Sequence, residues 1–549
     1  MRLSRCSVSR ASTLINQRQR AAAPAATPEP EYNRTFENGQ AHVTAINPAT
    51  DEHGILKLTP LKNFVAKKTP RHYPLPPEAV DGLKQALVDC LRAPKVLQHE
   101  ADQITEKLSQ RRFPASSKEV QAARKTIVEQ LKSKGESDAF LGPEYFSQKV
   151  NQAQDRYLQR EVSKKLKKTR YNWKPLEFDS REEAAAFTLS RLPAYYAEVR
   201  RVLAEFSRVD FAPKSVLDYG SGTGSVFWAV RDTWSDSVEE YCLVDTSDAI
   251  SQFAMDVMRG KGDQTGLIEK NVYFRRALVP SPQKKYDLTI IHRGLIEIGS
   301  HEKRLELIST LWQRTNRFLV IIESELEDSF EAVIQARNFI LTNGVKMDSR
   351  KVREELAEHN LLDETTEAIL HDRQMSYSEK YALIRERFPD PAALPTFIET
   401  GYVFAPCPHD QGCPKIDLPQ GKKSCKFSAR WNELRADGRT KSKRNDGTGT
   451  SMFSYTIMEK GMRPADTVSP SRVLDVKKAS GCVTCTTCTP FDGLLRFPVS
   501  RRAGPLYKLA KTCAPGSLFP IDGEMVASTS EYHVVREMLK EELGKSRKR

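Results

Sequence analysis

The sequence lacks any uninterrupted apolar run of the ~18–20 residues that a membrane-spanning helix needs. Its longest apolar pieces, such as "RFLVII", have the length of strands, so no transmembrane segment is predicted. Acidic residues are missing from the first 28 positions, which carry five arginines and several serines but no apolar h-region. This composition excludes a secretory signal and is typical of a mitochondrial presequence, with a disordered tail as the alternative.

Import to the mitochondrial matrix is therefore the expected localisation. That compartment is reducing, which argues against structural disulfides among the ten cysteines. The 549-residue chain has 85 Lys and Arg against 71 Asp and Glu residues, a formal net charge of +14. Such an excess favours a polyanionic partner, because each phosphate contact releases counterions. Nucleic acid is the expected partner.

The chain is too long for a single hydrophobic core of ordinary size, and the pattern of apolar and polar residues changes along the sequence. Short apolar strands alternate with amphipathic helices after Lys214, which predicts βαβ units, a parallel sheet and an α/β fold. We predict a presequence and disordered lead-in at 1–60, a helical N-terminal region at 61–205, a Rossmann-like domain at 206–400 with a helical insertion at about 343–395, a cysteine-rich extension at 401–520 and a basic tail at 521–549.

The segment "VLDYGSGTGSVFWAV" joins a buried strand to a helix through alternate glycines. Glycines let the backbone turn and approach a ligand, while the new helix presents free N–H groups. A carboxylate 21 residues beyond the last glycine closes the next strand, where it can accept hydrogen bonds from ribose hydroxyls. The arrangement resembles motif I and the acidic loop of class I S-adenosylmethionine-dependent methyltransferases; a tight turn without a ligand is the alternative. The candidate cofactor-binding residues are Asp218, Gly220, Gly222, Gly224 and Asp245.

Methyl transfer to a base usually needs a polar clamp or a nucleophilic cysteine after the fourth strand. Here that strand reads "YDLTIIHRGLIEI", with neither an N/D-P-P-Y clamp nor a Pro-Cys pair. His292 is a candidate base, and a hydrogen-bonded structural histidine is the alternative. The catalytic residues are therefore unknown, and enzymatic activity stays open.

Seven of the ten cysteines lie between residues 407 and 513, six of them in two groups of three. We expect them in loops and not on apolar faces, which favours metal or cluster ligation over packing. The pair in "CVTC" is common in zinc sites, whereas the C-x5-C-x11-C spacing of the first group suits an iron–sulfur cluster at least as well. A four-cysteine site would take the first group, Cys407, Cys413 and Cys425, plus one cysteine of the second, Cys482, Cys485 and Cys488.

Several segments occur in an order that resembles the mitochondrial small-ribosomal-subunit methyltransferase-like assembly factors, the methyltransferase-like protein 17 family. They are "SRLPAYYAEVRRVL", "VLDYGSGTG", "LVIIESELEDSFEAVIQAR", "VFAPCPHDQGCP", "SCKFSARW", "FSYTIMEKG" and "CTPFDG". The resemblance implies a matrix protein that assembles the small mitoribosomal subunit for mitochondrial translation, with small-subunit rRNA and ribosomal proteins as partners. It also implies a [4Fe-4S] cluster on Cys407, Cys413, Cys425 and Cys488, with Cys485 as the nearest competitor for the fourth position.

Two features depart from the family pattern. Glu323 is followed by Ser324, Glu325 and Leu326 where a glycine-containing loop is usual, and the charged block at 343–395 is larger than the usual connection. The leading hypothesis is an rRNA-binding assembly factor on a methyltransferase fold, with S-adenosylmethionine as a conditional cofactor. The alternatives are an active S-adenosylmethionine-dependent rRNA methyltransferase and a zinc-ribbon RNA-binding protein.

Overall fold

The structure of the chain is a computed structural model. It describes residues 34–37, 40–43, 55–60, 70–109, 111, 113–114, 117–133, 148–169, 175–260, 266–281, 283–344, 346–372, 375, 377–388, 398–416, 418, 423–439, 447–463, 470–490, 493–501, 505–519 and 521–526. The predicted presequence and most of the basic tail lie outside these residues. Among the described residues, no helix is both long and apolar enough to cross a membrane.

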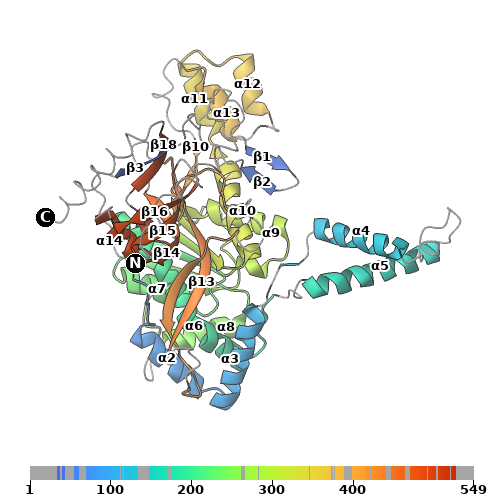
Figure 1. Cartoon of the computed structure of the whole chain (residues 1–549), viewed down its shortest axis with the longest axis vertical. Coiled ribbons are helices and arrows are strands. Elements are labelled where there is room, and N and C mark those ends of the chain that lie inside the picture. Colours follow the sequence, from blue (N-terminus) through green and yellow to red (C-terminus); the bar gives the residue numbers. More distant parts are fainter. Residues whose placement is uncertain are drawn as a thin grey trace, which may run out of the picture.

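An eight-stranded mixed sheet forms the centre of the molecule (Figure 1). Its strands are β4 (Ser215–Tyr219), β5 (Glu240–Val244), β6 (Val272–Arg275), β7 (Tyr286–His292), β8 (Thr315–Ser324), β11 (Gly401–Ala405), β12 (Phe427–Asn432) and β13 (Thr448–Lys460). The order is β11-β13-β8-β7-β4-β5-β6, with β12 also paired to β13. The parallel strands run outward from β4 in both directions, so the order reverses between β5 and β7. This topology confirms the predicted α/β fold, adds antiparallel strands to the predicted parallel sheet and puts a switch point at the end of β4.

The last two strands of the main path come from beyond residue 400. β13 pairs antiparallel with β8 and β11 pairs antiparallel with β13, so the cysteine-rich segment completes the central sheet. Both faces of the sheet are buried: Val216 belongs to one apolar cluster and the adjacent Leu217 to the other. Near-continuous apolar strands such as "SVLDY" are what a sheet covered on both faces requires.

Helices cover the two faces of the sheet. On one face lie α2 (Pro77–Val88), α3 (Pro94–Ser109), α6 (Arg181–Leu203), the 3-10 helix η2 (Ala204–Arg208), α7 (Ser225–Trp234) and α8 (Asp248–Met258). On the other lie the 3-10 helix η3 (Leu295–Glu297), α9 (His301–Gln313) and α10 (Glu327–Asn343). The long α6 begins where the Ser180 hydroxyl accepts a hydrogen bond from Glu183 N–H, a typical N-cap.

A second, four-stranded antiparallel sheet follows the central one. It consists of β14 (Ser471–Ala479), β15 (Cys482–Cys488), β16 (Leu494–Ser500) and β17 (Leu518–Phe519), and α14 (Pro505–Thr512) packs on it. The prediction that the second cysteine group lies in loops is therefore wrong, because these three cysteines belong to β15. The residues between them, "VT" and "TT", are β-branched, which favours a strand.

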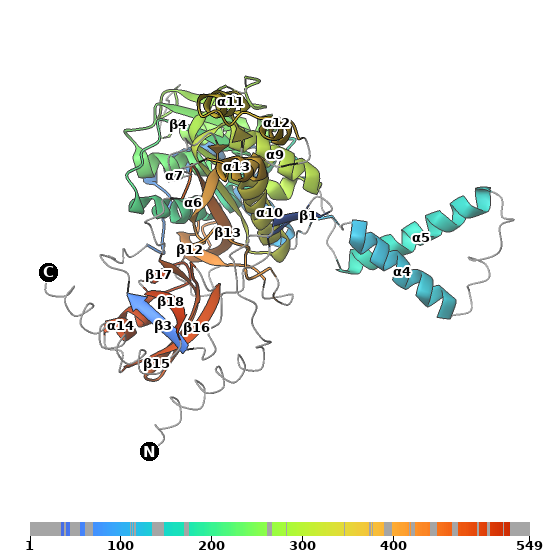
Figure 2. The ribbon, with the colours of Figure 1, turned by 90° about the horizontal axis from the view of Figure 1, so that it is seen from above.

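The insertion, a helical hairpin and two short strand pairs do not belong to the two larger sheets. The predicted insertion contains α11 (Ser349–Glu358), α12 (Glu364–His371) and α13 (Tyr377–Arg385), closed by β9 (Lys346–Met347) against β10 (Ile398–Glu399). The hairpin of α4 (Ser117–Ser133) and α5 (Gln148–Thr169) projects from the body in both views (Figures 1 and 2). Two short pairs are β1 (Arg34–Glu37) with β2 (Gln40–Val43), and β3 (Ile55–Pro60) with β18 (Ile521–Val526).

Candidate functional site

The glycine-rich turn lies at the switch point between β4 and α7. Gly220, Gly222 and Gly224 all have positive φ, at 74°, 44° and 73°. A Cβ on Gly224 would approach Met258 Cε to 2.3 Å, whereas a Cβ on Gly222 would meet only a backbone oxygen at 3.8 Å. Gly224 is therefore needed for conformation and packing, while the surface above Gly222 is open to a ligand.

Asp245 at the end of β5 braces this turn. One carboxylate oxygen accepts a hydrogen bond from Gly222 N–H at 2.9 Å and the other from Ser247 N–H at 3.0 Å. A carboxylate has about four acceptor positions, so Asp245 can also accept ribose hydroxyls. Asp218 differs, because it is fully buried and neither of its oxygens has a hydrogen-bond partner among the described residues. Burial and the nearby Asp245 raise the pKa of Asp218 well above its usual range.

A cavity of about 810 Å³ opens beside the turn, which is within the usual size range of small-molecule sites. Gly220, Gly222 and Asp245 line it, whereas Asp218 and Gly224 do not. The far wall is formed by α3, α6 and the ends of β7, β8 and β13. Residues 323–326, whose sequence departs from the family pattern, are part of this wall. The structure therefore brings three of the five predicted cofactor residues to one pocket.

His292 is held in a buried cluster at the end of β7. Its Nε2–H donates to Glu198 Oε2 at 2.9 Å, and Nδ1 lies 3.5 Å from the Ser225 hydroxyl. Arg293, with a positive φ of 58°, donates to both oxygens of Glu198 at 2.6 and 3.1 Å. Burial lowers the pKa of His292, which keeps it neutral. Both ring nitrogens are thus engaged, which supports the structural interpretation of this histidine over the catalytic one.

Four cysteines from separate segments converge next to α10. Cys425 donates a hydrogen bond to Cys413, and Cys407 and Cys488 interact electrostatically with Cys413. The hydrogen bond lowers the pKa of Cys413 to about 7. Burial raises the pKa of Cys407, and burial together with nearby thiols raises that of Cys488. The structure therefore brings together the four thiols that the family resemblance implies.

Cys485 and Cys488 lie on opposite faces of β15, as an odd separation within a strand requires. Cys485 is fully buried in the small core of the second sheet with Val483 and Phe519, and its thiol interacts with Cys513. Cys488 faces the first cysteine group and lies 3.2 Å from His409 Nε2. Only Cys488 of this pair is placed beside Cys407 and Cys413.

The loop that carries Cys407 and Cys413 is held by a buried arginine from α10. Arg337 donates hydrogen bonds to the carbonyl oxygens of His409 and Gln411 at 3.0 and 2.7 Å. Its guanidinium is within electrostatic range of Cys407, Cys413 and Cys488. Neither Arg337 nor His409 was identified from the sequence. His409 stands between two of the predicted ligands in "CPHDQGC", whereas nothing local in sequence marks Arg337.

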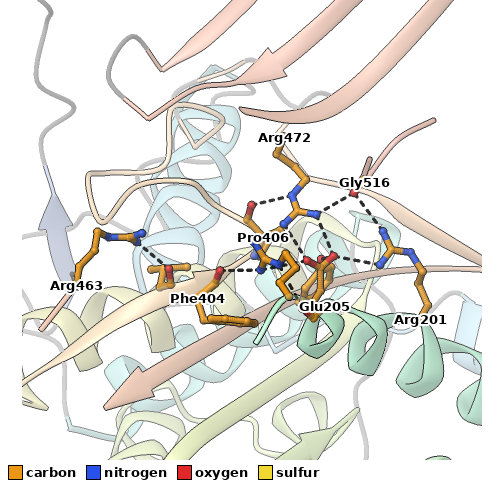
Figure 3. Close-up of polar contacts among 10 residues, drawn as sticks. Arg201, Glu205, Phe404, Pro406, Arg463, Arg472 and Gly516 are labelled. Atoms are coloured by element: carbon orange, nitrogen blue, oxygen red, sulfur yellow. Dashed lines mark hydrogen bonds and ion pairs between the residues drawn. The ribbon is translucent and has the colours of Figure 1, made fainter. Parts of the chain in front are cut away.

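A buried ion cluster joins the second sheet to the central sheet and its helices (Figure 3). Glu205 accepts hydrogen bonds from Arg472 at 2.9 and 3.0 Å, and from Arg201 at 3.2 Å. Arg472 also donates to Pro406 O at 2.9 Å, directly before the first candidate ligand. Both arginines donate to Gly516 O, as Figure 3 shows. The cysteine loop, β14 and the end of α6 are therefore linked through side chains that water does not reach.

The side chains were also compared with the geometry that a single bound metal ion requires. Among the described residues, no group of three or more His, Cys, Asp or Glu side chains is arranged so that it could hold a metal ion. The nine cysteines in the described part of the chain are free thiols.

The sequence matches a family model described as mitochondrial small ribosomal subunit Rsm22, over residues 181–349 and 383–520. The human ribosome assembly protein METTL17, mitochondrial, is 26% identical over 486 residues, which are 88% of this chain and 90% of the human protein. The Rsm22-cox11 tandem protein 2, mitochondrial, of Schizosaccharomyces pombe is 22% identical over 395 residues, 65% of this chain. The match spans 46% of the yeast protein, less than half of its length.

Solved methyltransferase structures are similar to parts of the chain. Human N-acetylserotonin methyltransferase in complex with SAM is 17% identical with a TM-score of 0.20, covering 27% of this chain and 40% of that one. Magnesium protoporphyrin IX methyltransferase from Synechocystis with bound SAH is 12% identical with a TM-score of 0.23, covering 62% of this chain and 100% of that one.

The relatives named above are mitochondrial proteins, which confirms the predicted mitochondrial localisation. The two matched ranges contain the central sheet and the cysteine-rich segment, and the gap between them falls on the insertion of α11–α13. The match covers more than half of the sequence and confirms the predicted resemblance. The chain belongs to the mitochondrial small ribosomal subunit Rsm22 family.

Proposed function

We propose that this protein is an assembly factor of the small subunit of the mitochondrial ribosome. It acts in the matrix, binds small-subunit rRNA and carries a [4Fe-4S] cluster on Cys407, Cys413, Cys425 and Cys488. The observation that carries the proposal is the convergence of these four thiols in a member of the Rsm22 family. The human relative that covers most of the chain is named a ribosome assembly protein, which agrees with this role.

The donor set fits an iron–sulfur cluster. Clusters of this type are held by four cysteine thiolates, and the four thiols here come from the β11 end, two following loops and the end of β15. Arg337 and Arg472 lie within electrostatic range of Cys407 and Cys488, where they favour the thiolate forms. When bound, the cluster would crosslink segments that no disulfide joins.

Four cysteine thiolates can hold either an iron–sulfur cluster or a zinc ion. We favour the cluster over the zinc ribbon because the first cysteine group has no C-x2-C pair and because the family resemblance implies a cluster. Metal and sulfide analysis separates the two.

S-adenosylmethionine is the small-molecule ligand that the pocket suits best. Gly220 and Gly222 leave an open backbone surface, and Asp245 can accept ribose hydroxyls while it braces the turn. The cavity is large enough for a nucleoside with an attached amino acid. The residues thus fit the cofactor, which when bound would supply a methyl donor.

The cluster assignment is tested with anaerobically purified full-length protein. Iron, acid-labile sulfide, zinc and the visible spectrum are measured for the wild type, Cys488→Ser and the matched control Cys485→Ser. We expect iron and sulfide in equal amounts in the wild type and the control, and loss of both in Cys488→Ser. Stoichiometric zinc, or a Cys488→Ser protein that keeps its chromophore, would contradict the cluster proposal.

The assembly role is tested in cells that express these variants. Sedimentation of mitochondrial extracts separates immature small subunits from complete ribosomes. We expect wild-type protein to associate with the immature small subunit, and Cys488→Ser to lose that association and to slow mitochondrial translation. Absence of the wild-type protein from the immature small subunit, together with unchanged translation in cells that lack the protein, would rule out a role in assembly.

Methyl transfer to rRNA is the second candidate function, and the pocket is the observation that favours it. His292, the candidate base predicted from the sequence, has both ring nitrogens engaged. The Gly222→Arg variant would fill the open surface above the turn. Loss of one methylated rRNA nucleotide in this variant, with assembly intact, would favour the enzymatic function.

A further inference from the structure

Most charged groups that line the pocket are neutralised by the protein itself. Arg111 donates to both oxygens of Glu297, and Arg293 donates to both oxygens of Glu198. Arg276 pairs with Asp248 on the outer side. The carboxylates of Asp245 and Glu323 accept backbone N–H groups. Glu325 lies at the end of β8, partly exposed to solvent.

Arg191 is the exception among the arginines. It lies on α6 between Phe187 and Tyr195, one helical turn from each, and all three line the pocket. Its Nε and Nη2 atoms are buried, and no described residue accepts a hydrogen bond from them. Burial lowers the pKa of Arg191 without the compensation that a dedicated carboxylate would give. The nearest acid, Glu198, already accepts hydrogen bonds from Arg293, His292 and Ser451.

A buried guanidinium without hydrogen-bond acceptors at the wall of a cavity destabilises the fold unless a bound ligand supplies the acceptors. Buried polar groups are nearly always hydrogen-bonded, and buried charges are nearly always paired. A guanidinium presents its donors in a planar fork that matches a carboxylate or phosphate. The missing partner of Arg191 is therefore an oxyanion that enters the pocket.

The position of Arg191 points to the source of this oxyanion. Arg191 interacts with Tyr195 and Arg293, which lie around His292 at the end of β7. Asp245 instead ends β5, and β4 lies between β5 and β7 in the sheet. Two strand spacings separate the two ends of the site, roughly 10 Å. A ligand with a ribose at one end and an amino-acid tail at the other can span this distance.

We propose that Arg191 binds the carboxylate of the amino-acid tail of an S-adenosyl ligand. The inference rests on the proposed binding of S-adenosylmethionine and adds the residue that distinguishes this ligand from a bare nucleoside. A phosphate of the rRNA is the other oxyanion that a guanidinium would accept. The experiment below separates the two sources.

The test compares Arg191→Met with Arg200→Met in the full-length protein. Arg200 is on the same helix but pairs with Asp232 and Thr233 of α7 and does not line the pocket. Calorimetry measures the affinity for S-adenosylhomocysteine and for methylthioadenosine, which lacks the amino-acid tail. We expect Arg191→Met to weaken S-adenosylhomocysteine about 10- to 100-fold, the range of hydrogen bonds to charged groups. Methylthioadenosine affinity should be unchanged in both variants, and Arg200→Met should bind both ligands as the wild type does.

Thermal unfolding without ligand gives a second readout. Removal of an unpaired buried charge should raise the midpoint for Arg191→Met by a few degrees, whereas loss of a structural arginine would lower it. If wild-type protein binds no S-adenosylhomocysteine, the proposed cofactor fails and this subsite fails with it. If the wild type binds it and Arg191→Met binds it equally well, only the subsite is overturned. A lower affinity of Arg191→Met for rRNA alone would assign Arg191 to phosphate and would also overturn the proposal.

Discussion

Glu205 is the residue on which the junction between the two sheets depends. Its carboxylate is buried between Arg201, Arg208 and Arg472, and these cations lower its pKa despite the opposing effect of burial. We expect Glu205→Gln to lower the free energy of unfolding by about 3–5 kcal/mol, because it leaves buried arginines without their counter-charge. Chemical unfolding followed by fluorescence measures the change.

The matched control is Glu100→Gln, which removes a carboxylate from the partly exposed pair with Arg92. Exposed ion pairs contribute little to stability, so this variant should unfold close to the wild type. Equal effects of the two substitutions would show that the buried cluster does not hold the junction.

Glu323, which lines the pocket, makes the stability of the fold depend on pH between 4.5 and about 7. Its Oε1 accepts hydrogen bonds from Leu295 N–H and Ile296 N–H, but burial raises its pKa from 4.5 to about 7. Between these two values the folded protein keeps a proton that the unfolded chain has lost. Stability therefore falls as the pH rises from 4.5 to 7 and is constant above. The full effect of this one group is about 3 kcal/mol, since one pKa unit corresponds to about 1.4 kcal/mol.

The Glu323→Gln variant removes this titration and keeps the accepting oxygen. We expect its free energy of unfolding to fall less than that of the wild type between pH 5 and pH 8, by up to about 3 kcal/mol. Urea unfolding at the two pH values measures the difference. The exposed Glu239, which pairs with Lys214, provides a control variant that should follow the wild type. Parallel pH profiles for Glu323→Gln and the wild type would contradict the assignment.

At the scale of elements, local sequence patterns predicted the strands, helices and turns that depend on residues close together in the chain. The alternation of apolar strands and amphipathic helices predicted β4, β5, β7 and β8 with their helices, and alternate glycines predicted the turn after β4. The strand β15 was not predicted, because closely spaced cysteines are also typical of metal-binding loops, although the residues between them are β-branched. Its alternation would have separated Cys485 from Cys488 without a structure.

Other parts of the site depend on contacts between distant segments. Arg337 reaches a loop more than 70 residues away, and Glu198 meets Arg293 and Ser451 across 95 and 253 positions. Nothing in the helical periodicity of α6 or α10 distinguishes these residues from other charged positions. Burial of a charge is a property of the packed fold, and a single sequence does not carry it.

The insertion of α11–α13 is expected to be dispensable for folding. It has its own apolar cluster, which includes Val352, Leu356 and Ile384, and most of it falls in the gap between the two ranges of the family model, residues 350–382. β9 and β10 pair at its base, so Met347 lies opposite Ile398. Replacement of residues 348–397 by a short glycine-rich turn should therefore leave the thermal midpoint of the remaining chain within about 3 °C of the wild type. Aggregation or a lost cooperative transition would show that the insertion supports the core.

The whole molecule carries its positive charge unevenly. α5 has seven Lys or Arg and two Asp or Glu residues, whereas residues 349–388 of the insertion have seven and nine. The hairpin of α4 and α5 projects away from the body, and its own apolar contacts include Ile127 and Val162 (Figure 2). An exposed basic helix on a projecting hairpin can follow a phosphate backbone without steric conflict from the rest of the chain.

Reversal of two exposed charges on α5 should weaken rRNA binding and its salt dependence together. Arg156 and Arg160 are four residues apart and share one exposed face of the helix. If each contacts a phosphate, Arg156→Glu with Arg160→Glu should reduce the slope of log affinity against log salt by about 1.5, since each phosphate contact contributes ~0.7–0.9. Binding to a small-subunit rRNA fragment at several salt concentrations measures this slope. The same double reversal at Arg350 and Lys351 of the insertion should leave it unchanged, and an equal loss at both places would mean that net charge, and not the hairpin, governs RNA binding.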